Sequence, residues 1–200
     1  MERNTLKDTD SATLKIDLQQ GFYLSPIVKT DKAAYLTHLA DPYITSNLLV
    51  VPYPYTEEHA DFWLDLRAND TFPYTFFAIR RSDGFLIGTI GTHIEKNNHI
   101  LEFGYWLTSE YRGMSLMPVA IQVFCRYVFQ HFPGAHRIQA GIFSFNDASG
   151  RALVKAGFTN ESGILRHYYK KGDQFIDAIM YSLLSTDVMP VVEVKTRSEK

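Results

Sequence analysis

The sequence predicts an α/β fold, a single domain in which helices cover both faces of one mixed sheet. Segments that alternate apolar and polar residues recur between segments with helical periodicity. The 200-residue chain, with 46% hydrophobic residues, is also long enough to bury one substantial core. We expect this domain to occupy residues 1–200, with an ordered core over about 13–185 and frayed termini.

The first half is expected to form a strand, two helices and three antiparallel strands, over residues 14–27, 30–40, 56–68, 74–81, 85–94 and 99–109. Thr30 or Asp31 is the expected cap of the first helix, and Thr56 that of the second. Residues 41–56 are aromatic and broken by prolines, which predicts an irregular loop. The turns SDG and EKNN are expected to join the three strands.

In the second half, apolar residues at helical spacing predict a helix over 115–132. A strand, a helix and a closing hairpin follow, over residues 136–143, 147–157, 158–169 and 175–184. The complete expected order is β-α-α-β-β-β-α-β-α-β-β.

Composition excludes several classes of partner. Twenty Lys and Arg residues nearly balance 22 Asp and Glu residues, so we expect no nucleic-acid partner. No apolar run is long enough for a membrane span, the N-terminus has no signal-like apolar stretch, and Cys125 is the single cysteine. These features favour a soluble, cytoplasmic protein without disulfides, and Cys125 is expected in the core. The seven histidines show no metal-ligand spacing, so no metal is expected.

Three segments, LEFGYWLTSEYRG, FNDASGRALVKAGF and FIDAIMYSLL, resemble the GNAT acetyltransferase superfamily, and most of all its RimJ/RimL-type branch of protein N-terminal acetyltransferases. The resemblance runs from about Leu14 to Leu184. It implies a fold in which acetyl-CoA wedges between two splayed parallel strands. The pyrophosphate would then lie at the N-terminus of the following helix, where unpaired N–H groups and the helix dipole attract an anion.

The family pattern Q/R-x-x-G-x-G/A falls on the start of that helix. The resemblance implies a phosphate-binding turn made of Arg112, Gly113, Met114, Ser115, Leu116 and Met117. Only Arg112 matches the pattern, because Ser115 and Met117 replace its small residues. Ser115 could cap the helix or donate its hydroxyl to phosphate, but its Cβ should resist a positive φ. The alternative is an ordinary turn into a core helix.

The second motif, N-x-x-S-x-R/K-x-L-x-K-x-G-F, implies that Asn146 binds the pantetheine amide and that Ser149 lies near the thioester sulfur. Asn146 could instead simply cap the helix. Leu153 stands where many branches place a tyrosine general acid, which leaves Ser149 as the candidate acid. Arg151 and Lys155, together with Arg112, are candidates for the 3′-phosphate of CoA, although the first two could equally be solvated surface residues.

The third motif gives the candidate base. Alternation places Glu102, Gly104 and Trp106 on one face of a strand. The resemblance implies that Glu102 is the general base, acting directly or through water. The alternative is an edge-exposed or salt-bridged glutamate. Tyr105, Trp106 and Leu107 would lend backbone groups to the acetyl and pantetheine arms.

The expected activity is acetyl transfer from acetyl-CoA to a primary amine by direct attack, in a monomer or a homodimer. The acceptor could be a protein N-terminus, which we prefer, a polyamine or a small xenobiotic. Five aromatic residues could line its entrance or simply pack: Tyr53, Tyr55, Trp63, Tyr168 and Tyr169. The alternatives are a non-catalytic CoA-binding or protein-interaction module on the same fold, and a transferase for a longer acyl-CoA.

Overall fold

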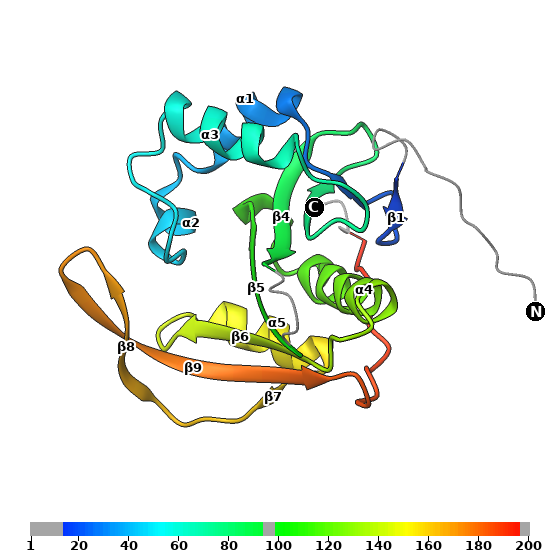
Figure 1. Cartoon of the computed structure of the whole chain (residues 1–200), viewed down its shortest axis with the longest axis vertical. Coiled ribbons are helices and arrows are strands. Elements are labelled where there is room, and N and C mark those ends of the chain that lie inside the picture. The colour runs from blue at the N-terminus through cyan, green and yellow to red at the C-terminus, as the bar shows by residue number, and fades with distance from the viewer. Residues whose placement is uncertain (1–13, 94–98, 197–200) are drawn as a thin grey trace, which may run out of the picture.

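The computed structural model describes residues 14–93 and 99–196. Over these residues the chain forms a nine-stranded sheet in the order β1-β2-β3-β4-β5-β6-β9-β7, with β8 pairing with β9 outside that path (Figure 1). The strands are β1 (Ile16–Asp17), β2 (Tyr23–Pro26), β3 (Phe76–Arg80), β4 (Leu86–Thr92), β5 (Ile100–Leu107), β6 (Arg137–Phe143), β7 (Thr159–Asn160), β8 (Leu165–Lys171) and β9 (Gln174–Leu184). The helices are η1 (Lys29–Asp31), α1 (Lys32–His38), α2 (Pro42–Ser46), α3 (Glu57–Arg67), η2 (Ser109–Tyr111), α4 (Leu116–His131) and α5 (Asp147–Ala156).

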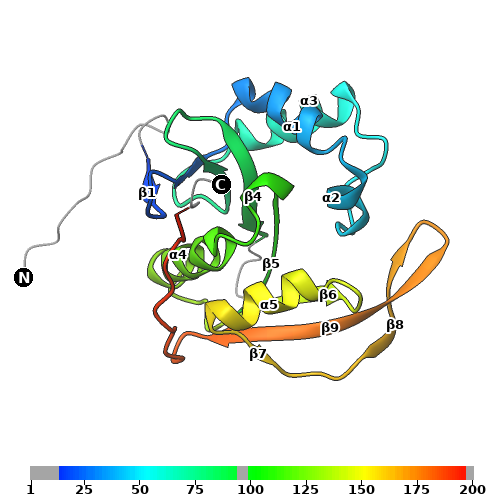
Figure 2. The same cartoon turned by 180° about the vertical axis from the view of Figure 1, so that it is seen from behind.

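Helices cover both faces of the sheet, as expected. Helices α4 and α5 pack with the strands around the larger core (Figure 2). The fully buried side chains of this core include Phe77, Ile121 and Phe124. Helices α1 and α3 pack on the other face in a second core that contains Tyr35 and Trp106. The strict alternation along β5 therefore sends its side chains into two separate cores.

Most expected elements are confirmed. Strands β3, β4 and β5 form the antiparallel meander, although the turn EKNN lies outside the described residues. Helix α3 begins after Thr56, whose Oγ1 accepts a hydrogen bond from the N–H of His59 at 3.4 Å. Helix α5 ends at Gly157, where φ is +106°, a value that glycine accepts without steric cost.

Three expectations about elements were wrong. The strand predicted over 14–27 is two short strands, because Gln19, Gln20 and Gly21 all have positive φ and turn the chain back on itself. The predicted loop 41–56 contains the short helix α2, which Asp41 caps by accepting a hydrogen bond from the N–H of Tyr43. The predicted first arm of the closing hairpin is split into β7 and β8, both of which pair with β9.

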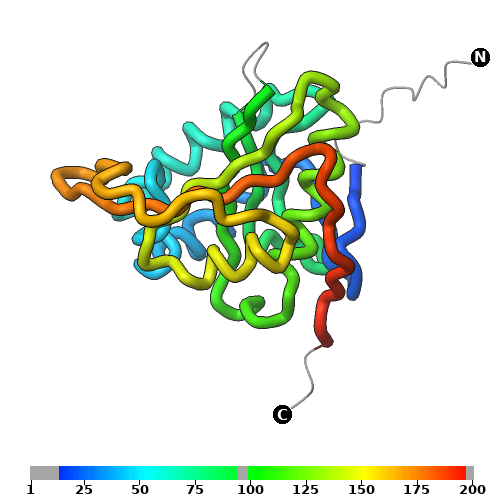
Figure 3. Tube along the Cα trace, turned by 90° about the horizontal axis from the view of Figure 1, so that it is seen from below, coloured from blue at the N-terminus to red at the C-terminus, as the bar shows by residue number. Residues whose placement is uncertain are grey.

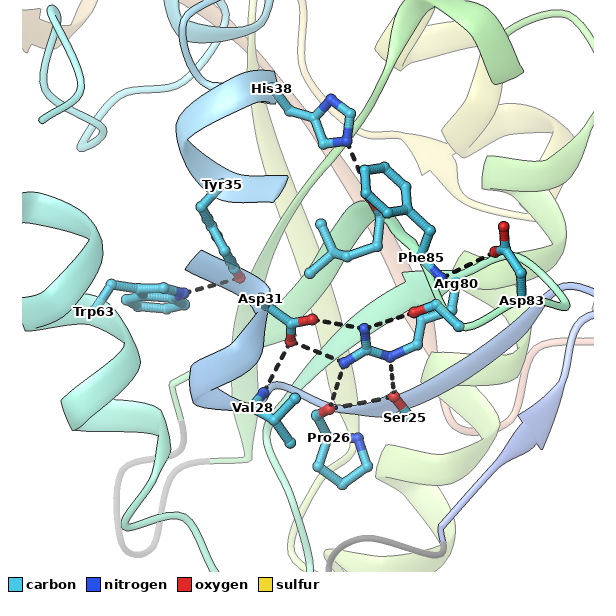
Figure 4. A network of polar contacts seen from close by, with 12 residues as sticks. Ser25, Pro26, Val28, Asp31, Tyr35, His38, Trp63, Arg80, Asp83 and Phe85 are labelled. Carbon is cyan, nitrogen blue, oxygen red and sulfur yellow. Dashed lines mark hydrogen bonds and ion pairs between the residues drawn. The ribbon is translucent and has the colours of Figure 1, made fainter. Parts of the chain in front are cut away.

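A buried ion pair fixes the start of α1 (Figure 4). Asp31 occupies the N-cap position of α1, as predicted, but its side chain caps the preceding η1 turn, where it accepts a hydrogen bond from the N–H of Val28 at 2.9 Å. Its carboxylate also accepts two hydrogen bonds from the guanidinium of Arg80 on β3, at 2.7 and 2.8 Å. Arg80 also donates to the Ser25 hydroxyl and to the carbonyls of Pro26 and Gly84. A buried charge pair requires such full hydrogen bonding to offset its desolvation.

The C-terminal segment is packed rather than frayed up to Val194. Val192 and Val194 are 8% and 4% exposed and belong to the larger core, so the ordered core extends beyond the predicted limit near residue 185. The predicted fraying up to about Ala12 lies outside the described residues.

Candidate active site

The two halves of the sheet diverge between β5 and β6. These parallel strands pair only over Ile100–Glu102 and Arg137–Gln139. Beyond Glu102, β5 continues beside β4 while β6 continues beside β9, and Figure 1 shows the two strands moving apart. Half of the backbone groups of the second part of β5 therefore face the divergence without a partner strand. Tyr105, Trp106 and Leu107 lie on this part of β5.

Glu102 lies at the last paired position, where the divergence begins. Its side chain is exposed, on the same face of β5 as Trp106. The phenol of Tyr169 on β8 donates a hydrogen bond to Oε1 of Glu102 at 3.3 Å. Burial, together with the charge of Glu102, raises the pKa of Tyr169, so the phenol stays protonated and remains a donor.

Glycines flank Glu102 on this face. A Cβ on Gly141 of β6 would lie 2.0 Å from the Tyr169 hydroxyl, so only glycine lets that ring cross β6 toward Glu102. A Cβ on Gly104 of β5 would meet no atom within 4 Å. The sheet surface next to the carboxylate is therefore open space.

The turn before α4 can hold an anion. Gly113 and Ser115 both have positive φ, +78° and +64°. Among the hydrogen bonds of the described residues, none uses a backbone N–H of residues 113–117. A Cβ on Gly113 would meet nothing within 4 Å, so the front of the turn is open. Five unpaired N–H groups beside a helix N-terminus match the chemistry of a diphosphate.

The Ser115 side chain does not cap the helix. It occupies the N-cap position without making a capping hydrogen bond, and its Oγ instead accepts one from Nζ of Lys155 on α5 at 2.6 Å. Donation of its hydroxyl to a phosphate stays a prediction. Ser115 adopts a positive φ of +64° although its Cβ makes this conformation costly. Lys155 brings a positive charge to the turn and helps to hold this conformation. Met117 is 7% exposed and packs into the core, while Leu116 is fully buried there. Met114, between Gly113 and Ser115, is only partly buried.

Asn146 and Ser149 stand at the start of α5. Oδ1 of Asn146 accepts a hydrogen bond from the N–H of Ser149 at 3.2 Å, so Asn146 caps the helix. The Ser149 hydroxyl shares a hydrogen bond of 2.7 Å with the hydroxyl of Tyr105 on β5. This pair spans the divergence and connects the two halves of the sheet. Burial raises the pKa of Tyr105, which keeps the phenol neutral.

The structure does not gather all the predicted phosphate-binding cations at the turn. Arg112 folds back over the end of β5, where it donates to the Leu107 carbonyl at 3.2 Å and stacks on Tyr43 with its Cζ 4.1 Å from the ring centroid. Arg151 is exposed and lines a cavity of about 390 Å³ between α5 and strands β6 and β9. Its contact with a 3′-phosphate stays a prediction.

A larger cavity, of about 720 Å³, lies between α2 and the protruding β8–β9 hairpin. Its lining includes Tyr53, Ser144, Phe145, Lys171, Phe175 and Asp177. Nζ of Lys171 donates to the carbonyls of Thr45 and Leu48 at 2.6 and 2.7 Å, which ties the hairpin to the C-terminal end of α2. Burial lowers the pKa of this ammonium group.

The five aromatic residues expected near the acceptor entrance have different environments. Tyr53 lines the larger cavity and Tyr169 contacts Glu102. Trp63 donates to the Tyr35 hydroxyl at 2.9 Å and packs in the second core beside Tyr55. Tyr168 is exposed and packs edge-on against Tyr169.

Among the described residues, no three or more His, Cys, Asp or Glu side chains gather as metal ligands. In the same part of the chain, no helix has the length and apolar character of a bilayer span. Cys125 is fully buried in the larger core, as expected, and burial raises the pKa of its thiol.

Diverging parallel strands, an amide-rich turn before α4 and a carboxylate at the branch point agree with the family suggested by the sequence motifs. The profile of the acetyltransferase (GNAT) domain matches residues 22–159, well over half of the chain. The chain belongs to this acetyltransferase family.

Curated relatives of this chain include two Bacillus proteins. YoaA of Bacillus subtilis, an uncharacterized N-acetyltransferase, is 37% identical over 107 residues, which are 52% of this chain and 59% of YoaA. The match thus spans less than two thirds of YoaA. The uncharacterized N-acetyltransferase p20 of Bacillus licheniformis is 28% identical over 156 residues, 74% of this chain and 84% of p20.

Solved structures share the fold of this chain. The ribosomal-protein-S5-alanine acetyltransferase from Vibrio fischeri has a TM-score of 0.73 at 21% identity, covering 88% of this chain and 100% of that chain. RimL, the ribosomal L7/L12 α-N-protein acetyltransferase in complex with CoA, has a TM-score of 0.73 at 17% identity, covering 86% and 98%. The expected fold is confirmed, and RimL-type enzymes are among its structural neighbours.

Sequence reasoning missed the contacts that connect the motifs to one another. The partners Ser115 and Lys155, Tyr105 and Ser149, and Glu102 and Tyr169 lie 40, 44 and 67 residues apart. A pattern in one segment carries no information about such a partner. The motif positions could be found, but their pairing could not.

Proposed function

We propose that this protein is an N-acetyltransferase that moves the acetyl group of acetyl-CoA to a primary amine by direct attack, with Glu102 as general base. The observation that carries the proposal is the position of Glu102. An exposed carboxylate stands where β5 and β6 separate, beside the open surface over Gly104. Such a carboxylate can accept a proton from an amine that lies on this surface.

The residues present fit the cofactor. The unpaired N–H groups of residues 113–117 suit its diphosphate, and Lys155 adds a positive charge. Asn146 uses its oxygen to cap α5, and its amide NH2 makes no hydrogen bond among the described residues, so it can still donate to a pantetheine carbonyl. Acetyl-CoA supplies a thioester carbonyl that a neutral amine can attack.

The free energy needed to deprotonate the acceptor, which is the task assigned to Glu102, depends on the pKa of the acceptor amine. An α-amine with a pKa near 7.8 is about a tenth neutral at pH 7, so removing its proton costs about 1 kcal/mol. A lysine side chain near 10.4 costs about 4–5 kcal/mol. A single exposed carboxylate is better suited to the α-amine.

Assisting the departure of the sulfur is a smaller task than deprotonating the amine. A thiol has a pKa near 8.5, so the departing CoA sulfur needs little proton donation at neutral pH. Leu153 is fully buried and cannot ionise, whereas the Ser149 hydroxyl is held by Tyr105 at the start of α5. We assign to Ser149 the donation of a hydrogen bond to the leaving sulfur, which departs as a thiolate and takes its proton from water.

The preferred acceptor is a protein N-terminus. Two structural neighbours, named above, act by their names on ribosomal proteins. The cavity of about 720 Å³ between α2 and the hairpin is larger than a simple amine needs and has room for several residues of a peptide.

Acetyl-CoA binding is measured first by calorimetry, and CoA release is then followed with a panel of peptides, polyamines and small amines. We expect Glu102→Gln to bind acetyl-CoA normally and to lose at least about 100-fold in kcat/KM, a usual contribution of a general base. Glu58→Gln, at an exposed site on α3, is the control and should match the unmodified protein. Normal turnover by Glu102→Gln would remove the assigned base.

The second candidate is a non-catalytic CoA-binding or interaction module, which the absence of an ionisable group at Leu153 favours. Tight CoA binding without turnover of any amine would establish it. A lack of any CoA binding would rule out both the enzyme and a CoA-binding module.

A further inference from the structure

The segment after β9 leads back toward the N-terminal strands. Residues 189–195, called here the C-terminal strap, run along α4 toward β1, and Figure 3 shows this red segment beside the blue N-terminal strands. Val191 is 93% exposed, Val192 and Val194 are 8% and 4% exposed, and the residues between and after them are exposed. This alternation buries every second side chain in the larger core, as in a strand.

Two glutamine side chains hold the backbone of the strap. Gln122 on α4 is only 3% exposed and donates from Nε2 to the carbonyls of Pro190 and Ala156, at 2.8 and 3.1 Å. Gln19 in the β1–β2 turn accepts from the N–H of Val194 at 2.9 Å. The strap is therefore fixed by two side-chain amides, of which that of Gln122 is buried, as well as by apolar packing.

The strap ends on the phosphate-binding turn. The N–H of Lys195 donates to the carbonyl of Met114 at 2.8 Å. In a trans peptide, the carbonyl of one residue and the N–H of the next point in opposite directions. Holding the Met114 carbonyl on the side of the strap therefore aims the Ser115 N–H away from it.

The turn needs such support. Gly113 and Ser115 both have positive φ, a conformation that a non-glycine residue adopts at a cost. The Lys155 ammonium holds the Ser115 side chain, and the Lys195 N–H holds the preceding carbonyl. The strap lies outside residues 22–159, the part of the chain matched by the family profile.

We propose that the C-terminal strap is a positioning element of the cofactor site, which holds the turn of residues 112–117 in the conformation that binds the CoA diphosphate. This inference rests on the proposed use of acetyl-CoA. The strap acts through backbone geometry, so the N–H of residue 195 matters more than its side chain.

A pair of substitutions at one position separates these contributions. Lys195→Pro removes the N–H and keeps an extended backbone, whereas Lys195→Ala keeps the N–H and removes the charge. We expect Lys195→Pro to raise the Kd for CoA and the KM for acetyl-CoA by about 10-fold, the scale of one lost hydrogen bond, with kcat unchanged. Lys195→Ala should stay within about 3-fold of the unmodified protein.

Acetyl-pantetheine, an acetyl donor without phosphates, separates a change in the phosphate-binding turn from a general loss of structure. A general loss of structure would lower the turnover of this donor, whereas a change confined to the turn would not. The turnover of acetyl-pantetheine should be equal in the unmodified protein and in Lys195→Pro. A chain ending at Val194 should repeat the effect on CoA without introducing a proline, and a chain ending at Thr196 is its control.

Equal CoA affinity in Lys195→Pro and Lys195→Ala would overturn the inference, as would parallel losses with acetyl-pantetheine. In both cases the proposed function would stand, because the unmodified protein still binds CoA. Failure of the unmodified protein to bind CoA would overturn the proposed function and this inference together.

Discussion

Glu102, Gly104 and Trp106 show how neighbouring residues on one strand face acquire different roles. All three point to the same side of β5, as alternation predicts. Trp106 is buried under α1, Gly104 has open space above it, and Glu102 is exposed beside Tyr169. The strand pattern determines the face, but the helices and the diverging strands determine what lies above each residue.

Gly104→Val tests whether the acceptor lies on this open surface. A Cβ here meets nothing within 4 Å, and valine favours a strand, so we expect unchanged or slightly increased stability. The added methyl groups should occupy the space next to Glu102 and raise the acceptor KM at least about 10-fold while the Kd for acetyl-CoA stays the same.

Gly163→Val is the matched control, since a Cβ at Gly163 also meets nothing within 4 Å and that residue lies outside the described site. Steady-state kinetics with the best peptide acceptor and calorimetry with acetyl-CoA give both quantities. Unchanged acceptor KM in Gly104→Val would place the amine elsewhere.

Ser115 shows that a residue pattern can predict the position of a turn but not the conformation of each residue in it. The family pattern located the turn correctly, and Pro118 in the first turn of α4 agrees with the predicted helix start. The conformation of Ser115 could not be predicted, because it is supported by Lys155 from α5 and by the strap through Met114. Both supports are distant in sequence.

At the scale of elements, the strongly periodic segments were predictable and the short irregular ones were not. Helices α4 and α5 and the meander have repeated apolar positions and clear ends such as Gly157. Helix α2 has five residues, too few for a period to be recognised. The C-terminal strap has only two buried valines, and their burial depends on the groove that α4 and the β1–β2 turn offer.

Among the contacts between elements, we expect the Asp31–Arg80 pair to be the one whose loss lowers the free energy of unfolding most. It joins the start of α1 to β3, and both side chains are buried (Figure 4). We expect Arg80→Met to lower the free energy of unfolding by about 3–5 kcal/mol, because it leaves the Asp31 carboxylate buried without its counter-charge.

Urea unfolding followed by circular dichroism measures this loss. Arg81→Met, next in the chain and half-buried with its guanidinium on Asp83, is the control and should change stability by less than about 1 kcal/mol. The double variant Asp31→Asn, Arg80→Met should recover part of the loss, since it no longer buries a lone charge. Additive losses in the double variant would contradict this account.

At the scale of the whole molecule, the two halves of the sheet share only a short parallel pairing, so other contacts must hold them together. Helix α4 packs with strands of both halves in one core. The Tyr105–Ser149 hydrogen bond, the Tyr169–Glu102 hydrogen bond and the Lys171 contacts with α2 all cross between the halves. Two of these five side chains are tyrosines, and the buried phenols of the fold make its stability depend on alkaline pH.

Burial raises the pKa of Tyr55 and of Tyr127 to about 12 in the folded protein. In the unfolded chain a tyrosine has a pKa near 10, so between pH 10 and 12 the unfolded state releases protons that the folded state keeps. The stability contributed by these neutral phenols is complete below pH 10. It is lost as pH rises toward 12, by up to about 3 kcal/mol for each group.

Urea unfolding between pH 8 and 11.5 should therefore show a plateau that ends near pH 10 and then a steep fall. Tyr127→Phe isolates one contribution. Its hydroxyl accepts a hydrogen bond from the N–H of Tyr74 at 2.8 Å, so the variant should be about 1 kcal/mol less stable at pH 8. Because phenylalanine cannot ionise, this deficit should shrink and then reverse as pH approaches 12. Stability curves for the two proteins that stay parallel up to pH 11.5 would show that Tyr127 ionises equally in the folded and unfolded states.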